Sequence, residues 1–125
     1  MNAKRFATAA IGGVVGVCVA QANAQSQGET ARLEAARSKE AYSQCLGNEI
    51  TQALPRNMSG SDFKIYIKDR CLNERNQFWT KLAAYLSIQF PNVAMAVHFK
   101  EADGAITKAI EDAASTYVDL KAKGR

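Results

Sequence analysis

Apolar residues recur at steps of three and four along three long segments of the chain, which is the spacing of one face of an α-helix. No stretch alternates apolar and polar residues as a half-buried strand does. The first helical stripe consists of Ala35, Tyr42, Cys45, Leu46, Ile50, Ala53 and Leu54. The pattern therefore predicts an all-α protein.

Two prolines separate the three predicted helices. Proline disfavours helical geometry at the residue before it, so a helix usually ends there. Pro55 separates a helix over about 27–54 from one over about 61–89, and Pro91 separates the second from a third over about 92–122.

Polar residues at the helix starts fit this division. Ser26 is followed three residues later by Glu29, and Ser59 by Asp62, which is the spacing of N-terminal caps. Gly104 lies within the third segment and is a candidate break or bend.

The apolar face of the second helix is broad, and the third helix keeps one side apolar to its end. A face of that width predicts packing against two neighbours, or against another chain. The second stripe consists of Phe63, Ile67, Cys71, Leu72, Phe78, Trp79, Leu82, Ala83, Leu86 and Phe90, and the third of Met95, Phe99, Ala102, Ile106, Ile110, Ala113, Tyr117 and Leu120.

Two cysteines lie at matching distances from the first turn. Cys45 is nine residues before Leu54, and Cys71 is nine residues after Asp62. At about 1.5 Å per residue, both thiols would lie roughly 13–14 Å from the turn of an antiparallel hairpin. The spacing predicts a Cys45–Cys71 disulfide, within a three-helix bundle made of a disulfide-stapled antiparallel hairpin and a third long helix. This fold forms a single domain over 25–125.

The N-terminus has the three-part layout of a secretory signal peptide. Lys4 and Arg5 precede an apolar stretch over residues 6–20, and Ala22 and Ala24 supply small residues at positions −3 and −1. We predict a signal peptide over residues 1–24, cleaved after Ala24, and a bacterial protein that is periplasmic or secreted. The alternative is a membrane-associated protein that retains this segment.

Export changes the charge and the cysteine count. The chain has 16 basic and 12 acidic residues; loss of Lys4 and Arg5 leaves 14 and 12, a net charge of +2. So weak a positive charge argues against nucleic-acid binding, which needs a concentrated basic surface. Cys18 also leaves, so that an even pair of cysteines enters an oxidising compartment.

Candidate chemical groups are few. His98 is the only histidine, and with Met95 three residues earlier it offers a thioether and an imidazole, ligands that suit copper. Glu74, beside Arg70 and Arg75, is a candidate acid or base or a partner in a surface ion pair. Because no complete catalytic set, phosphate loop or zinc spacing is present, we expect no enzyme activity and no cofactor.

The leading functional prediction is a non-enzymatic binding or structural module of the cell envelope. Hydrophobic residues make up 47% of the chain, and the broad apolar faces predict a partner protein or a homodimer. The candidate contact surface is Trp79, Tyr85 and Phe90. The alternatives are a stress-type chaperone that opens at low pH, and a weak enzyme or metal-binding protein that uses His98.

Overall fold

A computed structural model describes the backbone of residues 2–124 and the side chains of residues 26–124. Within these residues the protein consists of four α-helices and one short 3-10 helix, with no strand, so the all-α prediction is confirmed. The elements are α1 (Asn2–Ala53), η1 (Leu54–Arg56), α2 (Gly60–Lys68), α3 (Leu72–Gln89) and α4 (Met95–Lys123).

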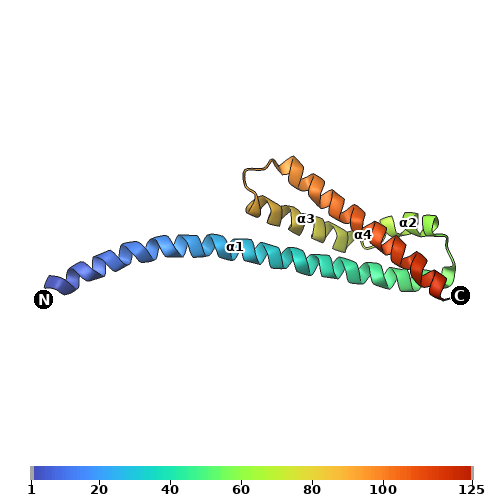
Figure 1. Cartoon of the computed structure of the whole chain (residues 1–125), viewed down its shortest axis with the longest axis horizontal. Helices are drawn as coiled ribbons and strands as arrows, with labels where there is room; N and C mark the ends of the chain where they lie inside the picture. The colour runs from blue at the N-terminus through green and yellow to red at the C-terminus, as the bar shows by residue number, and fades with distance from the viewer. Residues whose placement is uncertain (1, 125) are drawn as a thin grey trace.

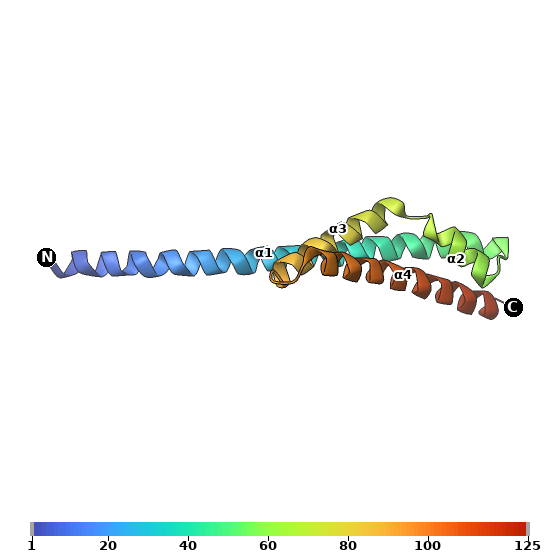
Figure 2. The same cartoon turned by 90° about the horizontal axis from the view of Figure 1, so that it is seen from above.

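Helix α1 is the long rod along which the others pack (Figure 1). α3 runs back antiparallel to the C-terminal half of α1, and α4 then crosses over the pair towards the C-terminus (Figures 1 and 2). α2 contacts α4 more than it contacts α1. The α3–α4 turn therefore lies at one end of the bundle, and the α1–α2 turn lies at the other with the C-terminus.

The predicted single helix over 61–89 is wrong, because the chain breaks between Lys68 and Leu72. Cys71 adopts a left-handed backbone conformation with φ of 56°, which interrupts the helix. The break allows α2 to pack on α4 while α3 packs on α1. No glycine or proline marks it in the sequence.

The other helix boundaries differ less from the predictions. In the full-length chain α1 runs over Asn2–Ala53. The predicted start near Gln27, capped by Ser26, concerns the chain after cleavage and stays a prediction. The third predicted helix, over about 92–122, is α4, which begins at Met95 and passes through Gly104 without a break.

The predicted cap at the start of α2 is confirmed. The Ser59 hydroxyl accepts a hydrogen bond from the Asp62 amide at 3.1 Å, which satisfies one of the free donors of the first helical turn.

The Cys45–Cys71 disulfide is also confirmed, with the two Cα atoms 6.0 Å apart. Cys71 is not in the middle of a helix as predicted; it is the N-terminal cap of α3. The bond therefore joins Cys45, eight residues before the end of α1, to the start of α3 and closes a loop of about 27 residues. A loop of that length contributes on the order of 3.5 kcal/mol in the chain-entropy account.

The core lies between α1, α2 and α4 and extends along α3. Phe63 of α2 stacks on Tyr117 of α4, with ring centroids 4.2 Å apart, and Tyr42 of α1 lies 6.3 Å from Phe78 of α3. The buried cluster consists of Tyr42, Leu46, Ile50, Ala53, Phe63, Ile67, Phe78, Ile110, Ala113 and Tyr117.

The signal-peptide prediction for residues 1–24 remains a prediction. Met1 lies outside the described residues, and the side chains of 2–25 lie outside the described part as well. A helical backbone is compatible with both a cleaved signal and a retained segment. Among the residues that the structure describes, no helix combines the length and hydropathy needed to cross a membrane.

Candidate functional site

The α3–α4 turn carries the main cluster of exposed apolar side chains. Of the eleven large apolar side chains that are exposed among the described residues, six fall between residues 88 and 99. Each is between 40% and 52% exposed. They come from the end of α3, the α3–α4 turn and the start of α4, which lie at one end of the bundle (Figure 1). We call this surface the apolar tip; it consists of Ile88, Phe90, Val93, Met95, Val97 and Phe99.

The backbone of the tip is held by hydrogen bonds centred on Phe90. The Phe90 amide donates to the Leu86 carbonyl at 2.8 Å, and the Phe90 carbonyl accepts from the Val93 amide at 3.2 Å. His98 Nε2 lies 3.1 Å from the same carbonyl. Since a carbonyl only accepts, Nε2 carries the proton in this bond. The most exposed aromatic side chain of the tip is thus presented on a fixed turn.

His98 and Met95 point to different surroundings. The His98 side chain is 2% exposed and turned into the bundle, whereas Met95 is 46% exposed. The imidazole Nε2 is engaged by the Phe90 carbonyl. The structure therefore gives His98 a positioning contact and does not direct the two side chains to a common point in solvent.

The three residues of the predicted contact surface have different environments. Phe90 is exposed and belongs to the tip, while Trp79 and Tyr85 are half-buried. The Trp79 ring stacks on Phe99 at 5.1 Å between centroids, and its indole N–H donates to Asp103 at 2.8 Å. Trp79 thus links α3 to the first turns of α4 and packs against Phe99 of the tip.

The remaining residues of the tip could have been found from a local pattern. Val93, Met95, Val97 and Phe99 are large apolar residues at every second position. On a helix, residues two apart point in different directions, so these side chains cannot all face one core.

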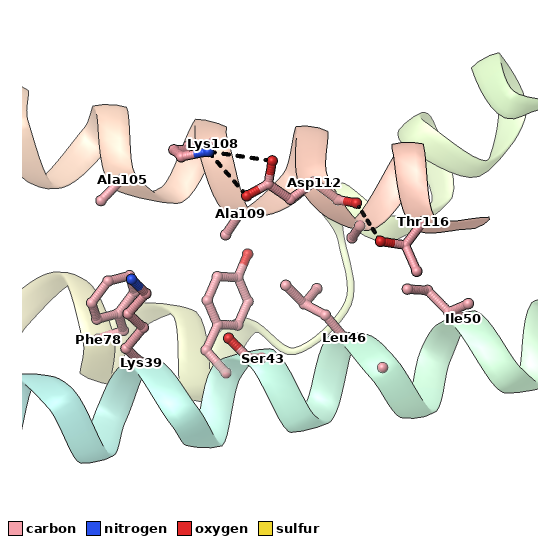
Figure 3. Close-up of a pocket in the computed structure, with 13 residues that line it drawn as sticks. Lys39, Ser43, Leu46, Ile50, Phe78, Ala105, Lys108, Ala109, Asp112 and Thr116 are labelled. Carbon is pink, nitrogen blue, oxygen red and sulfur yellow. Dashed lines mark hydrogen bonds and ion pairs between the residues drawn. The ribbon is translucent and has the colours of Figure 1, made fainter. Parts of the chain in front are cut away.

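A groove of about 350 Å³ runs between α1 and α4 (Figure 3). Its walls are mostly apolar, and Lys39, Lys108 and Asp112 stand among its polar lining residues. Lys108 and Asp112 form an ion pair at 3.2 Å along α4. The full lining is Lys39, Tyr42, Ser43, Leu46, Gly47, Ile50, Phe78, Ala105, Lys108, Ala109, Asp112, Ala113 and Thr116.

Tyr42 in this groove has an unusual hydroxyl. The side chain is 1% exposed, and its buried hydroxyl has no hydrogen-bond partner. Burial raises the pKa of the Tyr42 phenol above its ordinary value, because the phenolate would lose its hydration. A buried polar group without a partner costs about 1–3 kcal/mol relative to a paired one.

Glu74 lies beside the disulfide. Its carboxylate and the two sulfurs of Cys45 and Cys71 lie within 4.8 Å of one another. Both sulfurs are used by the disulfide, so the oxidised protein offers no thiolate there. The expected ion pair between Glu74 and Arg70 or Arg75 is not among the ion pairs of the described residues; Arg75 instead donates to the Lys68 carbonyl at 3.4 Å.

Comparison of the chain with protein-family models, with curated proteins and with solved structures finds no match.

Proposed function

We propose that this chain is an exported, non-enzymatic binding module that holds a partner protein through the apolar tip. The observation that carries the proposal is the gathering of exposed apolar side chains at residues 88–99. A gathering of exposed apolar side chains on a small protein costs solubility, and apolar patches commonly mark interaction sites. Aromatic residues and methionine, present here as Phe90, Phe99 and Met95, are enriched in protein interfaces.

Pre-organisation of the tip supports this proposal. Binding loses free energy when a loop must be ordered at the interface. The Phe90 backbone is already held by Leu86, Val93 and His98, and the ring of Phe99 rests on Trp79. Little of the binding free energy would therefore be spent on ordering the surface.

The size of the tip favours a different protein over a second copy as the partner. Six side chains exposed by 40–52% present on the order of 400 Å², taking roughly 150–250 Å² for a full aromatic side chain and less for aliphatic ones. Two tips facing each other would bury about 800 Å² in total, below the roughly 1,200–2,000 Å² of a specific stable interface. A partner with an apolar cleft can cover the protruding tip and its polar flanks together.

Export is the second part of the proposal, and it is supported by the N-terminal residues alone. Lys4, Arg5 and the small residues at Ala22 and Ala24 fit recognition and cleavage of a secretory signal. The mass of the protein recovered from its native cell envelope should correspond to a chain that starts at Gln25. A full-length chain with free Cys45 and Cys71 thiols would contradict export.

Position-specific photo-crosslinking tests the tip directly. A photoreactive amino acid is placed at Phe90 and, as a matched control, at Ile65, which is 67% exposed on α2. We expect one envelope protein to be crosslinked from position 90 and not from position 65. The purified pair should then bind in calorimetry, with Phe90→Ser lowering the affinity about tenfold or more and Ile65→Ser leaving it unchanged.

Three outcomes would contradict the proposal. They are equal crosslinking from both positions, no crosslinking from position 90, and crosslinking only between copies of the chain. Sedimentation velocity of the oxidised mature protein checks the last outcome independently, since a dimer formed through the tip would dissociate in the Phe90→Ser variant.

A further inference from the structure

The groove lies along the contact between α1 and α4, which has fewer polar links than the other helix contacts among the described residues. We call this contact the seam. Among the described residues, no hydrogen bond or ion pair joins α1 to α4, although the two helices are in contact. Each of the other contacting pairs of α-helices carries at least one polar link. These links are Glu34–Lys81 between α1 and α3, Glu49–Tyr66 between α1 and α2, Trp79–Asp103 between α3 and α4, and Lys64–Glu111 between α2 and α4.

Small residues keep this seam open. Ala105, Ala109 and Ala113 recur every four residues and form the α4 wall, opposite Leu46 and Ile50 of α1 (Figure 3). Alanine side chains facing leucine and isoleucine leave a channel where larger side chains would have closed the contact. From Lys39 to Ile50 the α1 wall is about 16 Å long at 1.5 Å per residue.

The orphan hydroxyl of Tyr42 belongs to this same seam. Tyr42 lines the groove, is more than nine-tenths buried, and has no partner for its hydroxyl. Unpaired buried hydroxyls are uncommon in native structures, and a ligand group that completes the hydrogen bonding of Tyr42 would account for this one. The hydroxyl itself is covered by neighbouring atoms, so a ligand would reach it as α1 and α4 part slightly, a movement that no polar link between them opposes.

The charges at the groove favour an anion. Lys39 and Lys108 line it together with Asp112, which leaves a net charge of +1. Asp112 is already paired with Lys108, while Lys39 takes part in none of the ion pairs of the described residues.

We propose that the α1–α4 groove binds a slender apolar molecule that ends in one anionic head group, as a single-chain carboxylate does. Its apolar body would lie along the alanine wall towards Ile50. Its head would lie near Lys39 and Lys108 and accept a hydrogen bond from the Tyr42 hydroxyl. Ligand sites of this kind are typically apolar clefts of about 300–1,000 Å³ with a few convergent polar groups.

This site is separate from the one used in the proposed protein binding. The tip lies at the α3–α4 turn, and the groove lies along the C-terminal part of α1 and the middle of α4. The inference therefore stands or fails independently of the partner protein.

Calorimetry on the mature, disulfide-bonded chain tests the site with a defined probe. The probe is dodecanoate, kept well below its micelle-forming concentration, and the control is dodecyltrimethylammonium, which has the same chain and the opposite charge. We expect one dodecanoate per chain, bound at least about tenfold more tightly than the cation, because the net charge of +1 at the groove, carried by Lys39, attracts one head group and repels the other.

Three variants test whether the probe binds in the groove. Ala109→Leu fills the groove and should abolish binding, while the thermal midpoint stays unchanged or rises because a cavity has been filled. Ala84→Leu, at an exposed alanine of α3, is the matched control and should bind normally. Tyr42→Phe should weaken binding about fivefold through the loss of one hydrogen bond.

Four results would overturn the proposal. They are no binding of dodecanoate by the unmodified chain, equal binding of the cation, unchanged binding by Ala109→Leu, and loss of binding in Phe90→Ser. The last result would assign the probe to the apolar tip. If Ala109→Leu fails to fold, unchanged affinity in both Tyr42→Phe and Lys39→Gln would overturn the proposal equally.

Discussion

At the scale of single residues, two buried tyrosines differ in whether their hydroxyls have partners. The Tyr117 hydroxyl donates to the Met58 carbonyl at 2.8 Å, whereas the Tyr42 hydroxyl has no partner. In the ligand-free chain at pH 7, Tyr117→Phe should lower the free energy of unfolding by about 1 kcal/mol, and Tyr42→Phe should leave it unchanged or raise it by about 1 kcal/mol. Urea unfolding of both variants measures the difference. Equal destabilisation would mean that the Tyr42 hydroxyl is paired in solution.

The same residue predicts a dependence of stability on alkaline pH. Burial raises the pKa of Tyr42 above its ordinary value of 10.0. Both states are neutral below that value, so the stability is fully present there. As the pH rises through it, the unfolded chain loses the proton first, and stability falls until the folded tyrosine also ionises.

We expect the unfolding free energy of the unmodified chain to fall by up to about 1.4 kcal/mol per pH unit above about pH 10 on account of this one proton. Tyr42→Phe should show a shallower fall. Part of the fall should remain, because the hydrogen bond to Glu49 raises the pKa of Tyr66 as well. Parallel curves for the variant and the unmodified chain would exclude Tyr42 as a source of the pH dependence.

His98 offers a prediction about the order of the apolar tip. Replacing it by leucine keeps an apolar side chain in the bundle but removes the donor to the Phe90 carbonyl. We expect a loss of about 1 kcal/mol of stability and faster hydrogen exchange at the amides of Phe90 and Val93. Met95→Leu, which changes an exposed residue, serves as the control. Unchanged exchange in His98→Leu would show that the turn is held without the imidazole.

At the scale of elements, the sequence pattern predicted which faces are buried better than where the helices end. The stripe of α1 predicted Tyr42, Leu46 and Ile50 in the core, and all three are buried. Periodicity reports the face that packs, because burial is what selects apolar residues at steps of three and four. Periodicity does not show where a single residue in a left-handed conformation changes the direction of the chain.

The break at Cys71 illustrates this limit. Aliphatic and charged residues surround it, and none is a helix breaker. The spacing argument for the disulfide still succeeded. The chain from the α1–α2 turn to Cys71 runs back along α1 about as far as a single helix would have done, so Cys71 reaches Cys45. The bond survives the break, since Cys71 still faces α1 from the start of α3.

A pair of variants that lack both Cys45 and Cys71 tests the strain at position 71. Cys45→Ser with Cys71→Ser should lose about 3 kcal/mol relative to the oxidised protein, because the loop constraint on the unfolded chain is gone. Cys45→Ser with Cys71→Gly should be about 1 kcal/mol more stable than the serine pair, since glycine adopts φ of 56° without steric cost. Chemical denaturation of both variants measures this.

Equal stability of the two variants would mean that the disulfide imposes the left-handed conformation on residue 71. In that case α2 and α3 would merge or change their boundary once the bond is absent, and the helical content of the serine variant would rise.

The candidate sites were only partly visible in the sequence. Phe90 was predicted as a contact residue, with Trp79 and Tyr85, on its aromatic character alone. The groove was not predicted, because it arises where alanines of α4 meet α1 residues more than fifty positions away. The missing partner of Tyr42 depends on the same long-range packing, so a pattern within one helix could not show it.

At the scale of the whole molecule, the covalent and polar links between helices are unevenly distributed over the bundle. α3 is tied to α1 by the disulfide and by the Glu34–Lys81 ion pair, and α4 is tied to α3 by the Trp79–Asp103 bond. At the opposite end, Tyr117 and Lys121 both donate to the Met58 carbonyl. α4 is therefore held at its two ends, and the middle of its contact with α1 is where the groove lies.

The apolar tip and the predicted mature N-terminus lie at the same end of the bundle. A Cβ placed on Gly28, three residues after Gln25, would lie 3.9 Å from the Ile88 side chain. The C-terminus lies at the other end of the bundle (Figure 1). A folded domain fused directly to Gln25 would therefore stand beside the tip, and the same domain at the C-terminus would stand away from it.

This geometry predicts an asymmetry between the two fusions. With the partner identified by crosslinking, the N-terminal fusion should lower the affinity about tenfold or more through steric exclusion, and the C-terminal fusion should leave it unchanged. A long glycine–serine linker at Gln25 should restore the affinity, because a flexible chain allows the fused domain to move aside. Calorimetry with the three proteins measures this. Equal effects from both fusions would place the interface away from the α3–α4 turn, whereas a loss that the linker does not restore would mean that the free N-terminal turn of α1 itself contacts the partner.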